Sequence, residues 1–275
     1  MNLAAIDTLH PHIDADRRLL VLTLDHGKAN EVGSEQLDAF EALCHLLEQH
    51  RDISTICTTS RRVSRRGKPL FIAGANVNER SEWDNHRVKA HVRRQREIMR
   101  RLRHLPVFSI VLTHGMTLGW GVEYLLTADY TLATPEASFA LPETGLGIIP
   151  GARGSAELAT RIGPAEALRL GCTGESVSAY EAHRIGLVQE VIADVDTGLS
   201  RVEALADLVR RRSPTAVAAF KGALLESLGR PESERLEAEA LAYELCVDSG
   251  EAATGRENFA KIVKGEVPPW GLRKP

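Results

Sequence analysis

Two kinds of apolar spacing alternate along the chain. Short apolar runs are typical of strands, and apolar residues three and four positions apart are typical of helices. The short runs predict strands at 19–24, 53–58, 69–72, 107–112 and 130–134, with shorter ones near Phe139 and at 187–191.

Helical spacing is clearest in two long segments. Glu35–Gln49 has one apolar face, and Ser34 is the expected N-cap. Asn85–His104 places Val88, Val92, Gln95, Met99 and Leu102 on one side. A glycine-rich tract at 118–121 opens another helix. Strands that alternate with helices at short spacing predict an α/β fold, here in ββα rather than βαβ units.

Composition is that of an ordinary globular protein: 275 residues, 43% hydrophobic and 26% charged. No stretch approaches the ~20 apolar residues that cross a bilayer, and the N-terminal segment lacks the basic start and apolar core of a signal peptide. We therefore expect a soluble, cytoplasmic protein. The four cysteines form no CxxC pair and the histidines no zinc-type cluster, so we expect free thiols and no metal site.

Charge is unevenly distributed, although the net charge is only −3. Arginines and lysines gather in 61–103, first in the loop 61–68 and then on one side of the predicted helix, at Arg93, Arg96, Arg100 and Arg103. A phosphate-bearing small ligand, a nucleic acid or plain solvation would each account for this asymmetry. Nucleic acid is the least favoured of the three because no recognition motif or interleaved aromatic residue accompanies the arginines.

Several common catalytic motifs are absent from the sequence. Gly145-Leu146-Gly147 lacks the third glycine of a dinucleotide fingerprint, and there is no GxxxxGK[ST]. No GxSxG nucleophile elbow occurs. These absences argue against a dehydrogenase, a P-loop enzyme and the commonest type of serine hydrolase.

Two glycine-bounded segments carry the clearest chemical signal. In 71–79 (FIAGANVNE) a strand ends in small residues, and Asn76 can cap a short helix. In 115–123 (GMTLGWGVE) a helix begins in glycine-rich backbone, so its first N–H groups are free. Amides from both segments, one of them from Ala75, could stabilise an oxyanion together.

Two glutamates stand close to these segments. Glu123 lies among apolar residues of the predicted helix, and Glu143 precedes a glycine-rich loop. A carboxyl group in such surroundings must stay protonated, form a pair or serve a function.

These segments resemble the crotonase superfamily, the enoyl-CoA hydratases and isomerases. The resemblance covers roughly residues 15–265 and is carried by FIAGANVNE, by 114–155, by 161–192 and by GRENFAKIVKG. It implies a spiral of ββα turns in residues 1–200, holding the CoA and acyl sites. It further implies a C-terminal helical region, 201–275, that builds trimers and often hexamers.

The same resemblance assigns roles to single residues. The oxyanion-hole amides fall on Ala75 and Trp120, and Gly151 falls in the active-site loop. Glu123 would activate a water that adds to C3 of an enoyl thioester, and Glu143 would supply the proton at C2. Retention of both glutamates favours hydration, or the reverse dehydration, within fatty acid metabolism. A double-bond isomerase or a biosynthetic dehydratase is the alternative, and a degenerate RNA-binding member is a further one.

Ligand contacts are also implied by the resemblance. Coenzyme A would bind as part of the substrate, with no tightly held cofactor. The candidate contacts are Lys28, Ala73, Lys68 (or Arg66), Phe259 and Lys264, the last two lent by a neighbouring subunit.

Three residues depart from the family pattern. Trp120 replaces the middle glycine of the usual GGG, which would place an indole at the active-site entrance or against a neighbour. Arg153 replaces a glycine at a helix start and would either bind a substrate carboxylate or lie in solvent. Asn76 replaces an aspartate, which keeps the cap and removes a charge.

Overall fold

A computed structural model describes residues 3–274. Its larger sheet has six strands in the order β1-β2-β3-β5-β7-β10, and β1 alone runs antiparallel to its neighbour. The strands are β1 (Pro11–Asp14), β2 (Leu19–Leu24), β3 (Thr55–Ser60), β5 (Phe108–Thr113), β7 (Tyr130–Ala133) and β10 (Glu190–Val191).

The smaller sheet has the order β4-β6-β8-β9, and β9 pairs antiparallel with β8. Its strands are β4 (Leu70–Ile72), β6 (Met116–Leu118), β8 (Ser138–Ala140) and β9 (Val177–Ser178). The strands follow one another in the pairs β3-β4, β5-β6 and β7-β8. In each pair the first strand belongs to the larger sheet and the second to the smaller sheet, and a helix follows. The expected spiral of ββα units is therefore confirmed.

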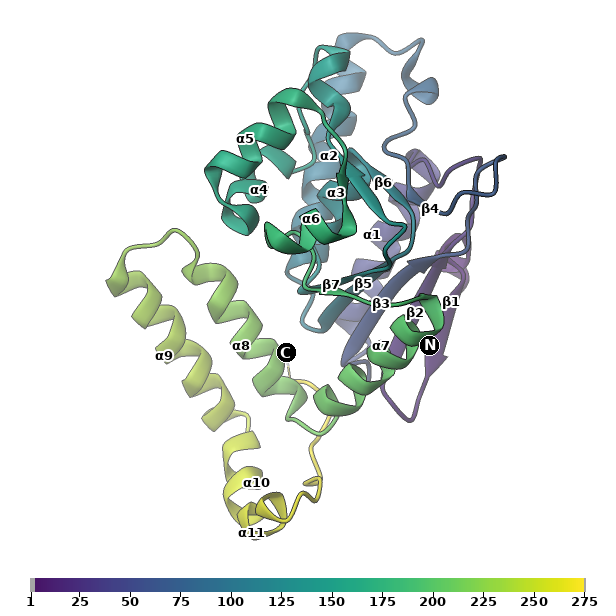
Figure 1. Cartoon of the computed structure of the whole chain (residues 1–275). Helices are drawn as coiled ribbons and strands as arrows, with labels where there is room; N and C mark the ends of the chain where they lie inside the picture. The colour runs from purple at the N-terminus through teal and green to yellow at the C-terminus, as the bar shows by residue number, and fades with distance from the viewer. Residues whose placement is uncertain (1–2, 275) are drawn as a thin grey trace.

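Helices cover the sheets and form the C-terminal region (Figure 1). The α-helices are α1 (Ser34–Gln49), α2 (Asn85–Arg103), α3 (Trp120–Leu125), α4 (Gly154–Ile162), α5 (Pro164–Thr173), α6 (Ala179–Arg184), α7 (Val195–Val209), α8 (Pro214–Ser227), α9 (Glu232–Asp248), α10 (Glu251–Glu257) and α11 (Phe259–Val263). Short 3₁₀ helices are η1 (Ala4–Leu9), η2 (Asn78–Arg80) and η3 (Pro142–Leu146). No helix of the described part is long and apolar enough to span a membrane.

A buried asparagine fixes the strands that lead to the site. Asn30 is fully buried, and its Nδ2 donates to Phe71 O (2.8 Å) and Ser60 Oγ (3.0 Å). Its Oδ1 accepts from His26 N at 2.8 Å. One side chain thus ties the ends of β2, β3 and β4 together, and its own φ of 53° is a conformation that asparagine tolerates.

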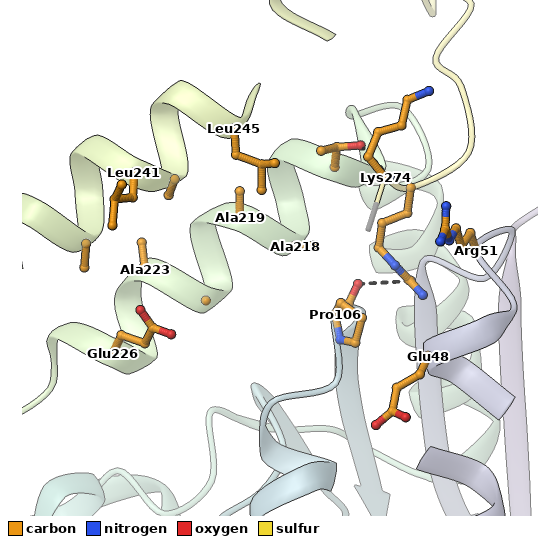
Figure 2. A pocket seen from close by; sticks show the side chains of 15 residues that line it. Glu48, Arg51, Pro106, Ala218, Ala219, Ala223, Glu226, Leu241, Leu245 and Lys274 are labelled. Atoms are coloured by element: carbon orange, nitrogen blue, oxygen red, sulfur yellow. Dashed lines mark hydrogen bonds between the residues drawn. The ribbon is translucent and has the colours of Figure 1, made fainter. Parts of the chain in front are cut away.

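The hairpin of α8 and α9 stands away from the sheets (Figure 1). Lys221 anchors it, since its Nζ donates to Asp129 Oδ2 (2.8 Å) and Val107 O (3.0 Å). A groove of about 430 Å³ separates the hairpin from the core, lined by small apolar residues such as Ala219. Figure 2 shows this groove. Arg273, which also lines it, donates to Pro106 O at 3.1 Å.

Some expected elements differ in the structure. Ser34 is not the N-cap of α1: Gly33 occupies that position, and the Gln36 side chain accepts from its amide at 3.1 Å. The strand expected at 53–58 is β3, which begins two residues later. The sequence reading missed β1, β6 and β9, because each is too short for its apolar pattern to be read without its pairing partner.

Candidate active site

Residues from four parts of the fold surround a cavity of about 400 Å³. They come from the segment after β4, from α2, from α3 and from the stretch between β8 and α4. The lining residues are Ala75, Arg80, Val88, Val92, Gln95, Arg96, Trp120, Glu123, Glu143, Ile148, Ile149 and Gly151. The fold therefore brings together both glutamates, both predicted amide residues and Gly151.

Glu123 lies on the first turn of α3 and is 4% exposed. Its Oε1 accepts from the amides of Ala152 (2.7 Å) and Gly154 (2.8 Å), which leaves Oε2 without a hydrogen bond from the described residues. Burial raises the pKa of Glu123 to about 7, and this effect outweighs the two backbone hydrogen bonds, which lower the pKa. The carboxyl group is thus poised between its ionised and protonated forms near neutral pH.

Glu143 lies on η3 and faces the loop before α3. A β-carbon on Gly119 would collide with Glu143 Oε1, so the glycine allows the carboxyl group to approach the backbone. Glu143 Oε2 is buried and has no hydrogen-bond partner among residues 3–274. Burial raises the pKa of this carboxyl group too, and the charge of Glu143 raises that of Glu123. Two such groups release their protons in separate steps.

The amide of Ala75 is free because of how its neighbours are bonded. Val32 N donates to Gly74 O (3.0 Å), and Asn76 N donates to Val32 O (2.9 Å), which pins the residues on both sides. In a parallel bridge of this kind the central amide points away from the partner strand. No acceptor for it occurs among the described residues.

The amide of Trp120 is free because it opens a helix. Gly119 is the N-cap of α3, with φ 49° and ψ −114°, and its own amide donates to Ala140 O at 2.9 Å. The first N–H of a helix has no intrahelical acceptor. Gly119 takes the positive φ, so the next position accommodates a large residue without strain.

The Trp120 indole is not at the site entrance, nor does it reach toward a neighbouring subunit. It is 2% exposed, stacks on Tyr124 with ring centroids 5.6 Å apart and lies 5.5 Å from Phe40. The expectation drawn from the sequence is wrong because Phe40 of α1 and the Tyr124 ring provide an apolar site on the inner side of the cavity. The buried indole Nε1 has no partner among the described residues.

Arg153 occupies the expected helix start, as the N-cap of α4, but it is not among the cavity-lining residues that the structure describes. Its φ of 85° lies in the left-handed region, which favours glycine. Its guanidinium pairs with Glu157, which also lies 3.4 Å from Arg103 Nη2. Arg153 is therefore engaged within the chain.

The expected CoA contacts divide into two groups. Lys28 and Ala73 lie close together, because Ala73 N donates to Ala29 O (3.1 Å) and Arg62 Nε to Lys28 O (3.3 Å). Lys68 ends an exposed turn in the same loop region. Phe259 is 66% exposed, and together with Lys264 it belongs to α11 and its cap. Helix α11 lies at the opposite end of the molecule from α2 and α3, which line the cavity (Figure 1).

The arginine side of α2 is largely bound to the rest of the chain. Arg96 Nε donates to Gly151 O (2.6 Å), Arg100 pairs with Glu97 (2.6 Å), and Arg103 donates to Leu126 O (2.5 Å). These contacts hold three of the four arginines within the chain, whereas Arg93 is exposed.

Three polar residues of the cavity were not recognised as residues of this site from the sequence: Arg80, Gln95 and Arg96. Gln95 did carry a signal, since it stands on the apolar side of the predicted helix, where a polar residue needs a reason. Arg80 and Arg96 carried none, because they look like any other member of the basic stretch.

Comparison with known proteins identifies the family of the chain. The model of the enoyl-CoA hydratase/isomerase family matches residues 17–267, and the chain belongs to this family. The 2,3-dehydroadipyl-CoA hydratase of Escherichia coli is 33% identical over 215 residues, 78% of this chain and 81% of that protein.

Two solved structures share the fold. The enoyl-CoA hydratase of Bacillus anthracis is 27% identical, with a TM-score of 0.82 over 94% of this chain and 95% of that chain. Pseudomonas aeruginosa DspI is 28% identical, with a TM-score of 0.85 over 96% and 97%. The α/β crotonase-like fold expected from the sequence is confirmed.

Proposed function

We propose that the protein hydrates a 2-enoyl-CoA thioester, or dehydrates the corresponding 3-hydroxyacyl-CoA. The observation that carries this proposal is the convergence on one cavity of the buried Glu123, the half-buried Glu143 and two residues with free amides. This set matches the needs of the reaction, in which the thioester oxygen gains negative charge while a water molecule adds across the adjacent double bond.

The amides of Ala75 and Trp120 hold the thioester oxygen as it becomes an enolate oxygen. Each donor of this kind typically contributes about 10²–10³ in rate. Ionised Glu123 takes a proton from water, whose oxygen bonds to C3. Protonated Glu143 gives its proton to C2, and a proton returned from Glu123 to Glu143 restores the starting state.

The hydrogen bonds of the two carboxyl groups support this division of roles. Glu123 accepts two backbone hydrogen bonds that stabilise its ionised form, whereas the buried Oε2 of Glu143 has none from the described residues. Glu123 is therefore the better candidate for the base and Glu143 for the acid. Both groups are needed for hydration, whereas an isomerase needs only proton transfer between carbons.

The assembled form is proposed to be a homotrimer or hexamer. Large apolar side chains are exposed on the C-terminal helices, among them Phe220 (72%) on α8 and Tyr243 (71%) on α9. Exposed apolar surface of this extent marks protein contacts. In such an assembly Phe259 and Lys264 would reach the CoA of a neighbouring subunit.

The test is an assay of purified protein with a series of trans-2-enoyl-CoA thioesters in ¹⁸O-labelled water. Hydration predicts loss of the enoyl absorbance and one ¹⁸O in the product. Double-bond migration of a 3-enoyl-CoA without ¹⁸O uptake would replace the hydratase by the isomerase. Failure to turn over any enoyl-CoA would overturn the proposal. Glu123→Gln and Glu143→Gln should each lower the rate by about 10² or more, while Glu97→Gln, on the outer side of α2, should not.

A further inference from the structure

The cavity contains a cationic group that the hydration mechanism does not use. Arg80, at the end of η2, lines it, and two of its guanidinium nitrogens, Nε and Nη2, are buried without a hydrogen-bond partner among residues 3–274. Arg80 as a whole is half-buried, but buried guanidinium nitrogens without acceptors are costly, so native structures normally pair them.

The adjacent acid acts on the charge of Arg80 but forms no ion pair with it. Glu79 directs its carboxylate to Ser34 instead, accepting from the Ser34 amide at 3.0 Å and from its hydroxyl. No ion pair of Arg80 occurs within the described part of the chain. Its positive charge therefore remains available to a ligand.

A second unpartnered donor lies on the same wall. Gln95 is 3% exposed, lines the cavity, and its Nε2 has no partner among the described residues. The same cavity is also lined by the apolar residues Val88 and Val92 of α2. Apolar walls with a few hydrogen-bond donors fit an acyl chain that ends in a hydrogen-bond acceptor.

Other arginines near the cavity are already engaged. The Arg96 Nε is bonded to Gly151 O, and the charge of Arg96 acts on Glu123. Arg153 pairs with Glu157 and does not line the cavity, so it is a poor candidate for the carboxylate contact considered for it from the sequence.

We propose that Arg80, assisted by Gln95, binds a carboxylate at the far end of the acyl group, so that the substrate is a dicarboxylic acyl-CoA. A carboxylate offers the two acceptor oxygens that a guanidinium fork accommodates. This inference rests on the proposed function for its thioester substrate, but it concerns binding at a place separate from the glutamates.

The test measures binding of ligands that cannot react. Hexanoyl-CoA and adipyl-CoA have acyl chains of equal length that end in a methyl and a carboxylate, and both are saturated, so hydration does not enter. CoA alone reports contacts to the nucleotide part. Titration calorimetry is carried out on the wild type, on Arg80→Met and on Arg93→Met, a control with the same loss of charge on the exposed side of α2.

The wild type should bind adipyl-CoA about tenfold or more tightly than hexanoyl-CoA. Arg80→Met should abolish this preference while leaving hexanoyl-CoA and CoA within about threefold, and Arg93→Met should preserve it. Equal binding of the two acyl-CoAs by the wild type overturns the proposal. An equal loss of affinity for adipyl-CoA, hexanoyl-CoA and CoA in Arg80→Met also overturns it. That result would mean that Arg80 contacts the CoA part of the ligand or has a structural role.

Two additions keep the result interpretable. Arg80→Lys retains the charge, and Gln95→Leu removes only the second donor, so selectivity can be followed if Arg80→Met does not fold. Selective binding of adipyl-CoA without turnover of any enoyl-CoA would refute the hydratase assignment and leave the carboxylate site standing. Hydration with no preference between 2-hexenoyl-CoA and 2,3-dehydroadipyl-CoA would refute the carboxylate site and leave the hydratase assignment standing.

Discussion

Gly154 both binds Glu123 and leaves room for it. The Gly154 amide donates to Glu123 Oε1 at 2.8 Å, and a β-carbon on Gly154 would lie 2.8 Å from that same oxygen. It would also lie 2.7 Å from the β-carbon of Pro150. The start of α4 is thus shaped around the proposed base.

Gly154→Ala should therefore displace Glu123 and lower kcat by about 10²-fold, since a shift of about 1 Å in a reacting group has an effect of this size. The matched control is Gly171→Ala in α5, where an added β-carbon meets no atom within 4 Å. Enoyl-CoA hydration is measured for both. A rate for Gly154→Ala close to that of the control would contradict the positioning role.

The raised pKa of Glu123 predicts a pH-dependent stability. The pKa is about 7 in the folded protein and 4.5 without the fold. Because the folded protein holds this proton more tightly than the unfolded chain, the group stabilises the fold fully at pH values below 4.5. This contribution is lost as the pH rises through the folded-state pKa of about 7. The loss amounts to about 3 kcal/mol, because each pKa unit corresponds to about 1.4 kcal/mol.

Glu123→Gln keeps the acceptor oxygen and removes the charge. It should equal the wild type in free energy of unfolding near pH 4.5 and exceed it by about 2–3 kcal/mol above neutral pH. Urea unfolding at one fixed protein concentration, at both pH values, gives the comparison. Residual pH dependence in the variant is expected from Glu143, whose pKa is raised in the same direction. The same stability difference at both pH values would refute the prediction.

Catalysis should have the opposite pH dependence to stability. The proposed base must be ionised, so kcat/KM is expected to fall about tenfold per pH unit as the pH drops below the pKa of Glu123, about 7. Arg96 lowers that pKa, so Arg96→Met should move the decline to higher pH, whereas Arg93→Met should not. A flat profile across the range from about pH 5 to 8 would exclude Glu123 as the base.

The ββα order and the position of Glu123 at a glycine-rich helix start could be predicted because their signal is local, whereas the roles of the two glutamates came from the family resemblance. Glu123 follows a glycine-rich helix start by one turn, and the ββα order can be read from spacing alone. Arg80 could not be predicted, because what distinguishes it is the absence of an acceptor once Glu79 has turned toward Ser34. That absence is a property of the tertiary structure, and the sequence shows only another arginine in a basic stretch.

Trp120 illustrates the same limit. The sequence places it at a helix start, and the structure agrees. The direction of its indole depends on Phe40, which α1 supplies from a distant part of the chain. Packing partners of this kind are determined by the fold, and the sequence around residue 120 does not indicate them.

The free amide of Trp120 can be tested without the indole. Proline is accepted at the first position of a helix and lacks the N–H. Trp120→Pro and Trp120→Gly lose the same stacking on Tyr124, but only the glycine variant retains the amide. Their kcat values for enoyl-CoA hydration should differ by about 10²–10³. Equal values would remove this amide from the oxyanion hole.

The exposed C-terminal helices predict the assembly. Phe220 is 72% exposed on α8, and aromatic side chains are unfavourable in water, so we expect it to be buried between subunits. Light scattering should give a mass about three times, or six times, the 30.1 kDa of one chain. Phe220→Glu should shift the protein toward the monomer, because a charge would be buried at the contact.

Val63→Glu is the matched control, since Val63 is 54% exposed on a loop away from these helices and the same charge there should leave the mass unchanged. Dissociation should also weaken CoA binding if Phe259 and Lys264 reach a neighbouring subunit. A wild-type protein that stays monomeric at high concentration would refute the proposed trimer, and CoA binding that is unchanged in the dissociated variant would place those two residues outside the CoA site.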